Sequence, residues 1–152
     1  MNRRQLLELI EEGENIQCEF KRHFTTPEKI AREMIAFANT KGGYMIFGVD
    51  DDKEVVGVDS EKSESEMIKD AAENFCEPRL IYSIDFIDVN GKEVVVVSIP
   101  ESDNKPHRLQ DYQSELDINK AVVVVRVNDK SVQASKEMVR ILRANSTDLS
   151  LK

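Results

Sequence analysis

The segment from Glu14 to Asp52 restricts the fold more than any other part of the chain. Its sequence indicates a short strand, a helix, two adjacent glycines and a second strand, in that order. Gly42 and Gly43 separate the helix from the second strand. Glycine tolerates positive φ and close backbone approach better than any other residue. The segment therefore predicts a helix whose chain turns sharply into a strand.

Apolar periodicity and capping residues define the first elements. Apolar and polar residues alternate over residues 16–21, which predicts a strand with Glu19 and Lys21 on the same face. Thr26 as N-cap and Pro27 at the first helical position predict the start of a helix that ends near residues 39–40. A strand is expected next over residues 44–49. The buried stripe of the helix is predicted to contain Ile30, Met34, Ile35, Phe37 and Ala38.

The rest of the chain predicts an α+β domain with a mixed, mainly antiparallel sheet of about six strands and three to four helices. A first helix is capped by Asn2 with Gln5 and ended by Gly13. A third helix begins at a capping box of Ser63 and Glu66, and a last helix follows Ser135. The last helix is predicted to place three apolar side chains inward: Met138, Ile141 and Leu142.

The second half of the chain is rich in predicted strands. Strands over residues 80–89 and 93–99 are joined by Asn90-Gly91, a strong hairpin signal. Val94 to Val97 are continuous enough to form a central strand buried on both faces. Further strands are expected over residues 54–58 and 121–127, and the polar stretch 100–120 is predicted to be a functional or mobile loop. Residues 1–144 are expected to form one domain and residues 145–152 a flexible tail.

Composition limits the classes of protein. The chain has 152 residues, which suits a single core, and a net charge of −8. No apolar run approaches the ~20 residues of a membrane span, and the first residues do not form a signal peptide. We therefore expect a cytoplasmic protein without a membrane role. Cys18 and Cys76 are expected to be buried thiols, since two distant cysteines form neither a metal knuckle nor a disulfide framework.

Several separate motifs of this chain resemble those of one known family. The matching residues are Glu14, Glu19-Phe20-Lys21, residues 36–40, Gly42-Gly43 and Gly48-Val49-Asp50. Later elements continue the likeness at residues 95–100, 105–107 and 125–135. Over roughly residues 5–143 the chain is similar to the Schlafen-type Alba-like domain in its single-lobe bacterial form. The resemblance implies an Alba-like fold and a nucleic-acid-binding domain, with transcriptional regulation as one use of it.

The resemblance also implies a second activity, that of a metal-dependent nuclease. Glu14, Glu19 and Asp50 match the acidic positions of the nuclease branch, where they would bind Mg²⁺ or Mn²⁺, and Lys21 would contact the phosphate. Hard divalent ions take oxygen ligands and can activate water against a phosphodiester. Taken without the resemblance, Glu14 is read as a solvated loop residue, Glu19 beside Lys21 as a surface charge pair, and Asp50 as a turn residue. No ATP site is expected, because no P-loop or dinucleotide fingerprint is present.

The negative net charge requires any nucleic-acid contacts to be concentrated on one face, since affinity comes from lysine and arginine neutralising phosphates. A homodimer would enlarge the shallow surface of a single lobe. The alternative to both nucleic-acid functions is a protein-interaction domain, which the acidic composition favours. The predicted nucleic-acid contacts are Lys21, Arg22, Lys41, Lys105, His107, Arg108, Arg126 and Lys130.

Overall fold

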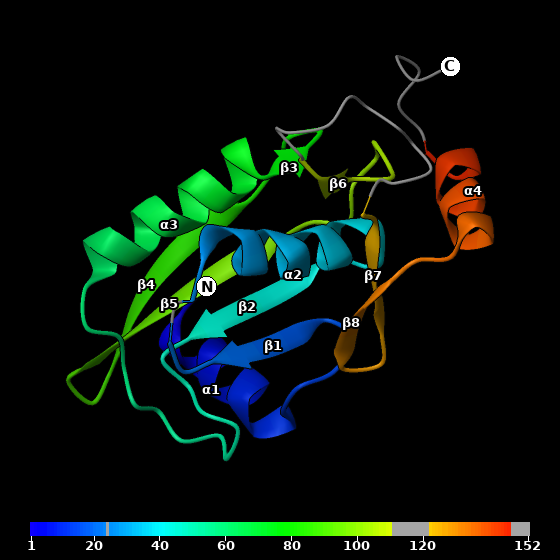
Figure 1. The fold of residues 1–152 in the computed structure, drawn as a ribbon. Helices are drawn as coiled ribbons and strands as arrows, with labels where there is room; N and C mark the ends of the chain where they lie inside the picture. Colours follow the sequence, from blue (N-terminus) through cyan, green and yellow to red (C-terminus); the bar gives the residue numbers. More distant parts are fainter. Residues whose placement is uncertain (24, 111–121, 147–152) are drawn as a thin grey trace.

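A four-stranded mixed sheet forms the centre of the molecule (Figure 1). The computed structural model describes residues 1–23, 25–110 and 122–146. The strand order is β1 (Cys18–Lys21), β2 (Gly43–Phe47), β5 (Lys92–Ile99) and β4 (Ser83–Val89). β1 and β2 are parallel, and the other neighbours are antiparallel. The predicted α+β class is therefore confirmed.

Helices cover both faces of this sheet. On one face, α1 (Arg3–Glu12) packs Leu6 and Ile10 against apolar residues of β1, β2 and β5. On the other face lie α2 (Pro27–Asn39) and α3 (Glu61–Asn74), which form the larger apolar cluster. Val94 to Val97 are fully buried because β5 is an interior strand with a helical layer on each side. The prediction of a central strand at this position is confirmed.

Short elements form the remainder of the fold. β3 (Cys76–Glu77) pairs with β6 (Arg108–Leu109), and β7 (Val124–Val127) pairs with β8 (Lys130–Gln133) to form a hairpin. α4 (Lys136–Ala144) follows this hairpin and lies at one end of the molecule (Figure 1). β7 contacts the carboxyl-terminal part of α2, where the Asn39 side chain donates to the carbonyl oxygen of Val124 at 3.0 Å. We call residues 122–146 the C-terminal arm.

Local capping signals located three of the four helices. Asn2 and Gln5 form the predicted capping box of α1, Thr26 caps α2, and Ser135 caps α4. α3 begins earlier than predicted, because the hydroxyl of Ser60 accepts the backbone N–H of Ser63.

Three other sequence predictions were wrong or incomplete. Residues 54–58 do not form a strand. Within them, Val55 forms an isolated bridge to Val49. The strand β8 was not predicted. Met138 and Ile141 are 39% and 49% exposed, whereas Leu142 is buried, because α4 packs on the small cluster of the arm rather than on the main sheet. Residues 111–120 of the predicted loop, and residues 147–152 of the predicted tail, lie outside the described residues.

Candidate functional site

The two charged residues of β1 lie on the face of the sheet that α2 covers. Cys18 and Phe20 pack with α1, so the alternation of the strand directs Glu19 and Lys21 toward the opposite face. Lys21 Nζ lies 2.5 Å from Glu33 Oε1 of α2 and 3.9 Å from Glu19 Oε1. The predicted shared face is confirmed, and Glu33 is an additional member that the sequence analysis missed.

Arg126 of β7 completes this cluster from the C-terminal arm. Its Nη1 donates to Glu19 Oε2 at 2.8 Å, and its Nη2 donates to the carbonyl oxygen of Asn15 at 2.7 Å. The guanidinium carbon lies 4.6 Å from the centre of the Phe37 ring, a cation–π arrangement. Only 1% of the Arg126 side chain is exposed. Arg126 was predicted to bind nucleic acid, but the structure places its charge inside the fold.

Two carboxyl groups of this cluster, those of Glu14 and Glu19, have raised pKa values. Burial raises the pKa of Glu19, and the nearby Glu33 raises it further, whereas Arg126 and Lys21 oppose the shift. Burial also raises the pKa of Glu14, whose Oε1 accepts the backbone N–H of Phe20 at 3.0 Å. Raised carboxylate pKa values are common at functional sites, but structural ion-pair networks produce them too. We call Glu14, Glu19, Lys21, Glu33 and Arg126 the acidic cluster.

Asp50 serves a local turn. Its Oδ1 accepts the backbone N–H groups of Asp52 and Glu54, each at 2.9 Å, which is the turn chemistry that aspartate favours. Within residues 1–23, 25–110 and 122–146, no three His, Cys, Asp or Glu side chains gather as a metal ion would require. Glu14, Glu19 and Asp50 therefore do not fit a shared Mg²⁺ or Mn²⁺ ion in this arrangement, and the metal site stays a prediction.

A second group of predicted contacts stabilises the loop after β5. Lys105 is buried, and its Nζ lies 2.5 Å from Glu101 Oε2. His107 donates from Nδ1 to the carbonyl oxygen of Pro78 at 2.7 Å, and its Nε2 accepts the hydroxyl of Ser102 at 2.6 Å. Burial lowers the pKa of His107, which agrees with a neutral ring.

Arg108 and Asn39 complete this loop network. Arg108 pairs with Glu77 at 2.9 Å. Buried Asn39 accepts the backbone N–H of His107 and donates to the carbonyl oxygens of His107 and Val124. Asn39 therefore connects α2, this loop and β7 through one side chain. Lys105, His107 and Arg108 all have intramolecular partners that hold the loop in place.

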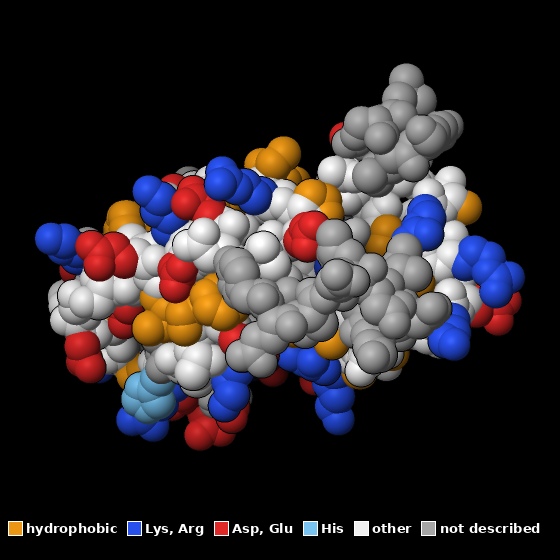
Figure 2. Space-filling view, turned by 45° about the horizontal axis from the view of Figure 1, so that its top comes forward, with side chains coloured by type: hydrophobic (Ala, Val, Ile, Leu, Met, Phe, Trp, Pro, Cys, Tyr) orange, Lys and Arg blue, Asp and Glu red, His pale blue; other side chains and the backbone are white. Residues whose placement is uncertain are grey.

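Accessible positive charge lies elsewhere. Arg22, Lys41 and Lys130 are exposed, as predicted contacts should be. Among the exposed residues of the C-terminal arm, four are Lys or Arg and two are Asp or Glu, although the whole chain has a net charge of −8. In the space-filling view, blue side chains lie at the right-hand end of the molecule and also over other parts of this face (Figure 2). Besides Lys130, the exposed members of this basic group are Lys136, Arg140 and Arg143.

The sequence analysis missed Glu33 and the pairing of Arg126 with Glu19, and only the first of these could have been predicted. Glu33 lies three positions after Ile30 and four before Phe37, so helical spacing places it at the border of the buried stripe of α2. This spacing, with the positive charge of Lys21 on the facing strand, could have identified it. The pairing of Arg126 with Glu19 joins residues 107 positions apart and left no local signal.

Comparison with known proteins identifies the family. The family model described as Schlafen, AlbA_2 matches residues 14–135. The chain belongs to this Schlafen AlbA_2 family. The match includes β1, α2, β2 and the hairpin β7–β8, and hence the whole acidic cluster.

Two solved structures have the same fold. One is the N-terminal domain of a protein of Nitrosomonas europaea named as RecG-related, after the ATP-dependent DNA helicase. It is 25% identical, with a TM-score of 0.60, and the match covers 89% of this chain and 94% of that one. The other is the DIP2311 protein of Corynebacterium diphtheriae, at 16% identity and a TM-score of 0.61. That match covers 88% of this chain but only a quarter (25%) of the other.

No helix within the described part of the chain is long and apolar enough to span a membrane. This finding agrees with the absence of a long apolar run in the sequence.

Proposed function

We propose that this protein binds nucleic acid through its C-terminal arm. The observation that carries the proposal is the local excess of accessible positive charge on residues 122–146 of an otherwise acidic chain. Family membership supports it, and so does the similarity to a domain of a protein named after a DNA helicase. Exposed lysine and arginine side chains bind phosphates by releasing counterions, whatever the base sequence.

Lys130, Lys136, Arg140 and Arg143 are the residues that contact phosphates in this proposal. Lys41 extends the surface, because it follows Thr40, whose hydroxyl accepts the backbone N–H of Arg126 in β7 at 2.9 Å. Arg126 itself contributes structure rather than affinity, since its charge is enclosed and paired. A transcriptional regulator would use the same arm on duplex DNA, and a homodimer would present two arms to one duplex.

The test measures binding of labelled transfer RNA, single-stranded RNA and duplex DNA at several salt concentrations by fluorescence anisotropy. We expect binding that weakens steeply with salt, with a loss of about 0.7–0.9 in the log–log slope for each phosphate contact removed. The variant Lys136→Gln/Arg140→Gln lowers affinity and reduces the slope by roughly two such contacts. The matched control, Arg3→Gln/Arg4→Gln, removes the same charge from exposed positions of α1 and leaves the slope unchanged.

The same samples in Mn²⁺ or EDTA test the nuclease prediction. Cleavage that requires Mn²⁺ and disappears in Asp50→Asn would support a metal-dependent nuclease. Salt-dependent binding without cleavage supports the recognition module. Absence of binding to all three nucleic acids would overturn the proposal and favour the protein-interaction alternative.

A further inference from the structure

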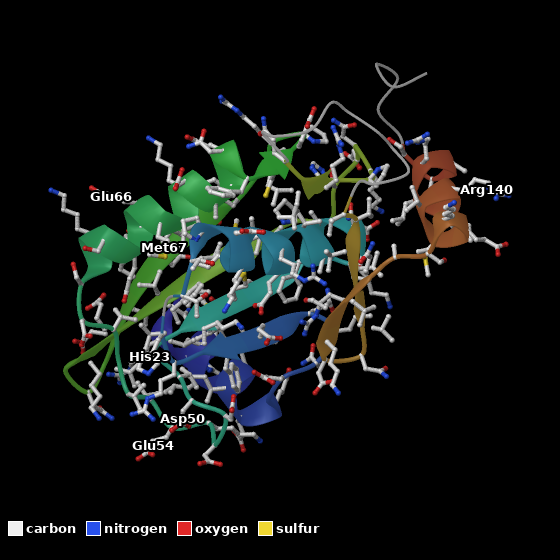
Figure 3. The ribbon with its side chains drawn as sticks, viewed as in Figure 1. His23, Asp50, Glu54, Glu66, Met67 and Arg140 are labelled. Atoms are coloured by element: carbon white, nitrogen blue, oxygen red, sulfur yellow. The ribbon has the colours of Figure 1, made fainter. Side chains whose placement is uncertain are left out.

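A hollow of about 430 Å³ lies at the opposite end of α2 from the C-terminal arm. One wall comes from Arg22 and His23, which directly follow β1, and another comes from α3, including Met67. Residues 56–60 form the rest of the lining. Figure 3 labels His23 and Met67 and shows that they come from these two different elements. The hollow is part of neither the acidic cluster nor the arm.

The backbone under this hollow is fixed to the sheet. The N–H of Gly48 donates to the carbonyl oxygen of Lys21 at 2.7 Å, and the N–H of Val56 donates to the carbonyl oxygen of Gly48 at 2.8 Å. Val58 donates to the carbonyl oxygen of Glu93 in β5 at 2.9 Å. The hollow is therefore a preformed feature, as binding sites for small groups usually are.

The charges around the hollow disfavour a phosphate. Asp59 and Glu64 provide two carboxylates against the single guanidinium of Arg22. At the first turn of α3, the hydroxyl of Ser60 accepts the N–H of Ser63, so this donor is not available to an anion. An uncharged group that donates hydrogen bonds to carboxylates suits this lining better than an anion does.

The remaining lining suits a flat ring. Val56, Val58 and Met67 provide apolar walls, and His23 and Arg22 provide planar groups at the rim. Unpaired bases are recognised by stacking on aromatic rings or guanidinium planes and by hydrogen bonds to their edges. Bases with an exocyclic amine can donate to carboxylates, whereas phosphates cannot.

We propose that this hollow binds one unpaired base of a single-stranded nucleic acid, with a preference for bases that have an exocyclic amine. The inference rests on the proposed function and adds to it a preference for nucleic acid that offers an unpaired base. α2 has 13 residues and is therefore about 20 Å long. It begins four residues after His23 and ends at Asn39, which contacts β7. A strand with one base in the hollow and its phosphates on the arm would have to span roughly this length.

The experiment is an abasic scan of a single strand of about 12 nucleotides, within the usual range of single-strand site sizes. Each oligonucleotide lacks one base and keeps every phosphate, so phosphate contacts are unchanged. We expect one position at which removal of the base weakens binding by about fivefold or more, because stacking of a single base has that effect. Uracil at the same position, which lacks the exocyclic amine, should bind more weakly than adenine or cytosine.

Two variants connect that position to the hollow. His23→Ala and Met67→Gln should each reduce the abasic effect severalfold, while salt-dependent binding by the arm persists. Lys29→Ala is the control, because Lys29 is an exposed cation of α2 outside the lining of the hollow. It should leave the abasic effect at its wild-type size.

The outcomes separate this inference from the proposed function. If no abasic position weakens binding more than the others, the proposed base site in the hollow is rejected, and the proposal that the arm binds phosphates still stands. If the abasic effect at one position is the same in both variants as in the wild type, that base binds elsewhere, and the proposed base site in the hollow is also rejected. Failure of the wild-type protein to bind any oligonucleotide at low salt overturns both proposals together.

Discussion

Positively charged or basic side chains lie beside both ends of α2, but their environments are opposite. At the carboxyl-terminal end, Arg126 is enclosed by Glu19, Phe37 and backbone carbonyl groups, and 1% of its side chain is exposed. At the amino-terminal end, Arg22 and His23 are exposed at the rim of an open hollow. The residue types are alike, but their neighbours differ.

This difference shows why positive residues near a motif are not equivalent evidence of binding. A buried guanidinium with carboxylate and carbonyl partners stabilises the fold. If it turned to bind a ligand, its carboxylate and carbonyl partners would remain buried without a hydrogen-bond donor. An exposed guanidinium beside a hollow has no such cost. The charge that serves function should therefore be the charge whose removal leaves stability unchanged.

The largest expected effect is at Arg126. Arg126→Met should lower the free energy of unfolding by about 3–5 kcal/mol, because Glu19 is left buried without its main partner. Arg22→Met is the matched change beside the amino-terminal end of α2, and it should alter the free energy of unfolding by no more than about 0.5 kcal/mol. Urea denaturation of the two variants measures both values. Comparable losses in the two variants would contradict the distinction between the ends.

Asn39 should give the next largest effect. Asn39→Leu removes the side chain that bonds His107 and Val124 and should cost about 2–4 kcal/mol, because buried backbone groups lose their partners. Leucine at exposed Asn74 is the control and should have little effect. Thermal unfolding monitored by circular dichroism compares them. A loss below about 1 kcal/mol at Asn39 would show that this connection between α2 and the arm is dispensable.

A smaller effect is expected at Glu14 and should appear as pH dependence. The folded state raises the pKa of Glu14, so it holds the proton to a higher pH than the unfolded chain does. This contribution to stability is present at low pH and is lost as pH rises from the unfolded pKa through the folded one. Glu14→Gln removes that loss, while the amide oxygen can still accept the N–H of Phe20.

The measurement compares unfolding free energies of the wild-type protein and Glu14→Gln between acidic and neutral pH. We expect the variant to gain stability relative to the wild type as pH rises. Parallel curves would show that Glu14 is not strained by burial. Glu8→Gln, which removes the same charge on the exposed face of α1, is the control.

The sequence predicted what depends on neighbours along the chain. Asn2, Thr26 and Ser135 identified helix starts because a cap acts within three residues. Alternation over residues 16–21 placed Glu19 and Lys21 on one face. The prediction of inward Met138 and Ile141 assumed that every apolar helix stripe packs on the main sheet, and α4 does not.

The sequence could not predict which charges are enclosed. Arg126 and Glu19 are brought together only when the arm packs on α2 and β1, and no periodic pattern encodes that contact. The same holds for Lys105 and His107, which the motif placed at a binding surface and the fold places inside a loop. The hollow arises from residues 22–23, 56–60 and α3, three segments that no single motif joins.

The most direct test of the account is an NMR titration of the isotope-labelled protein with a single-stranded oligonucleotide at low salt. The account predicts that amide shifts change along the C-terminal arm and around the hollow, including residues 22–23 and 56–60. Amides of α1, on the opposite face of the sheet, should remain unchanged. Shifts confined to α1, or no shifts at all, would contradict the claim that the C-terminal arm and the hollow bind nucleic acid.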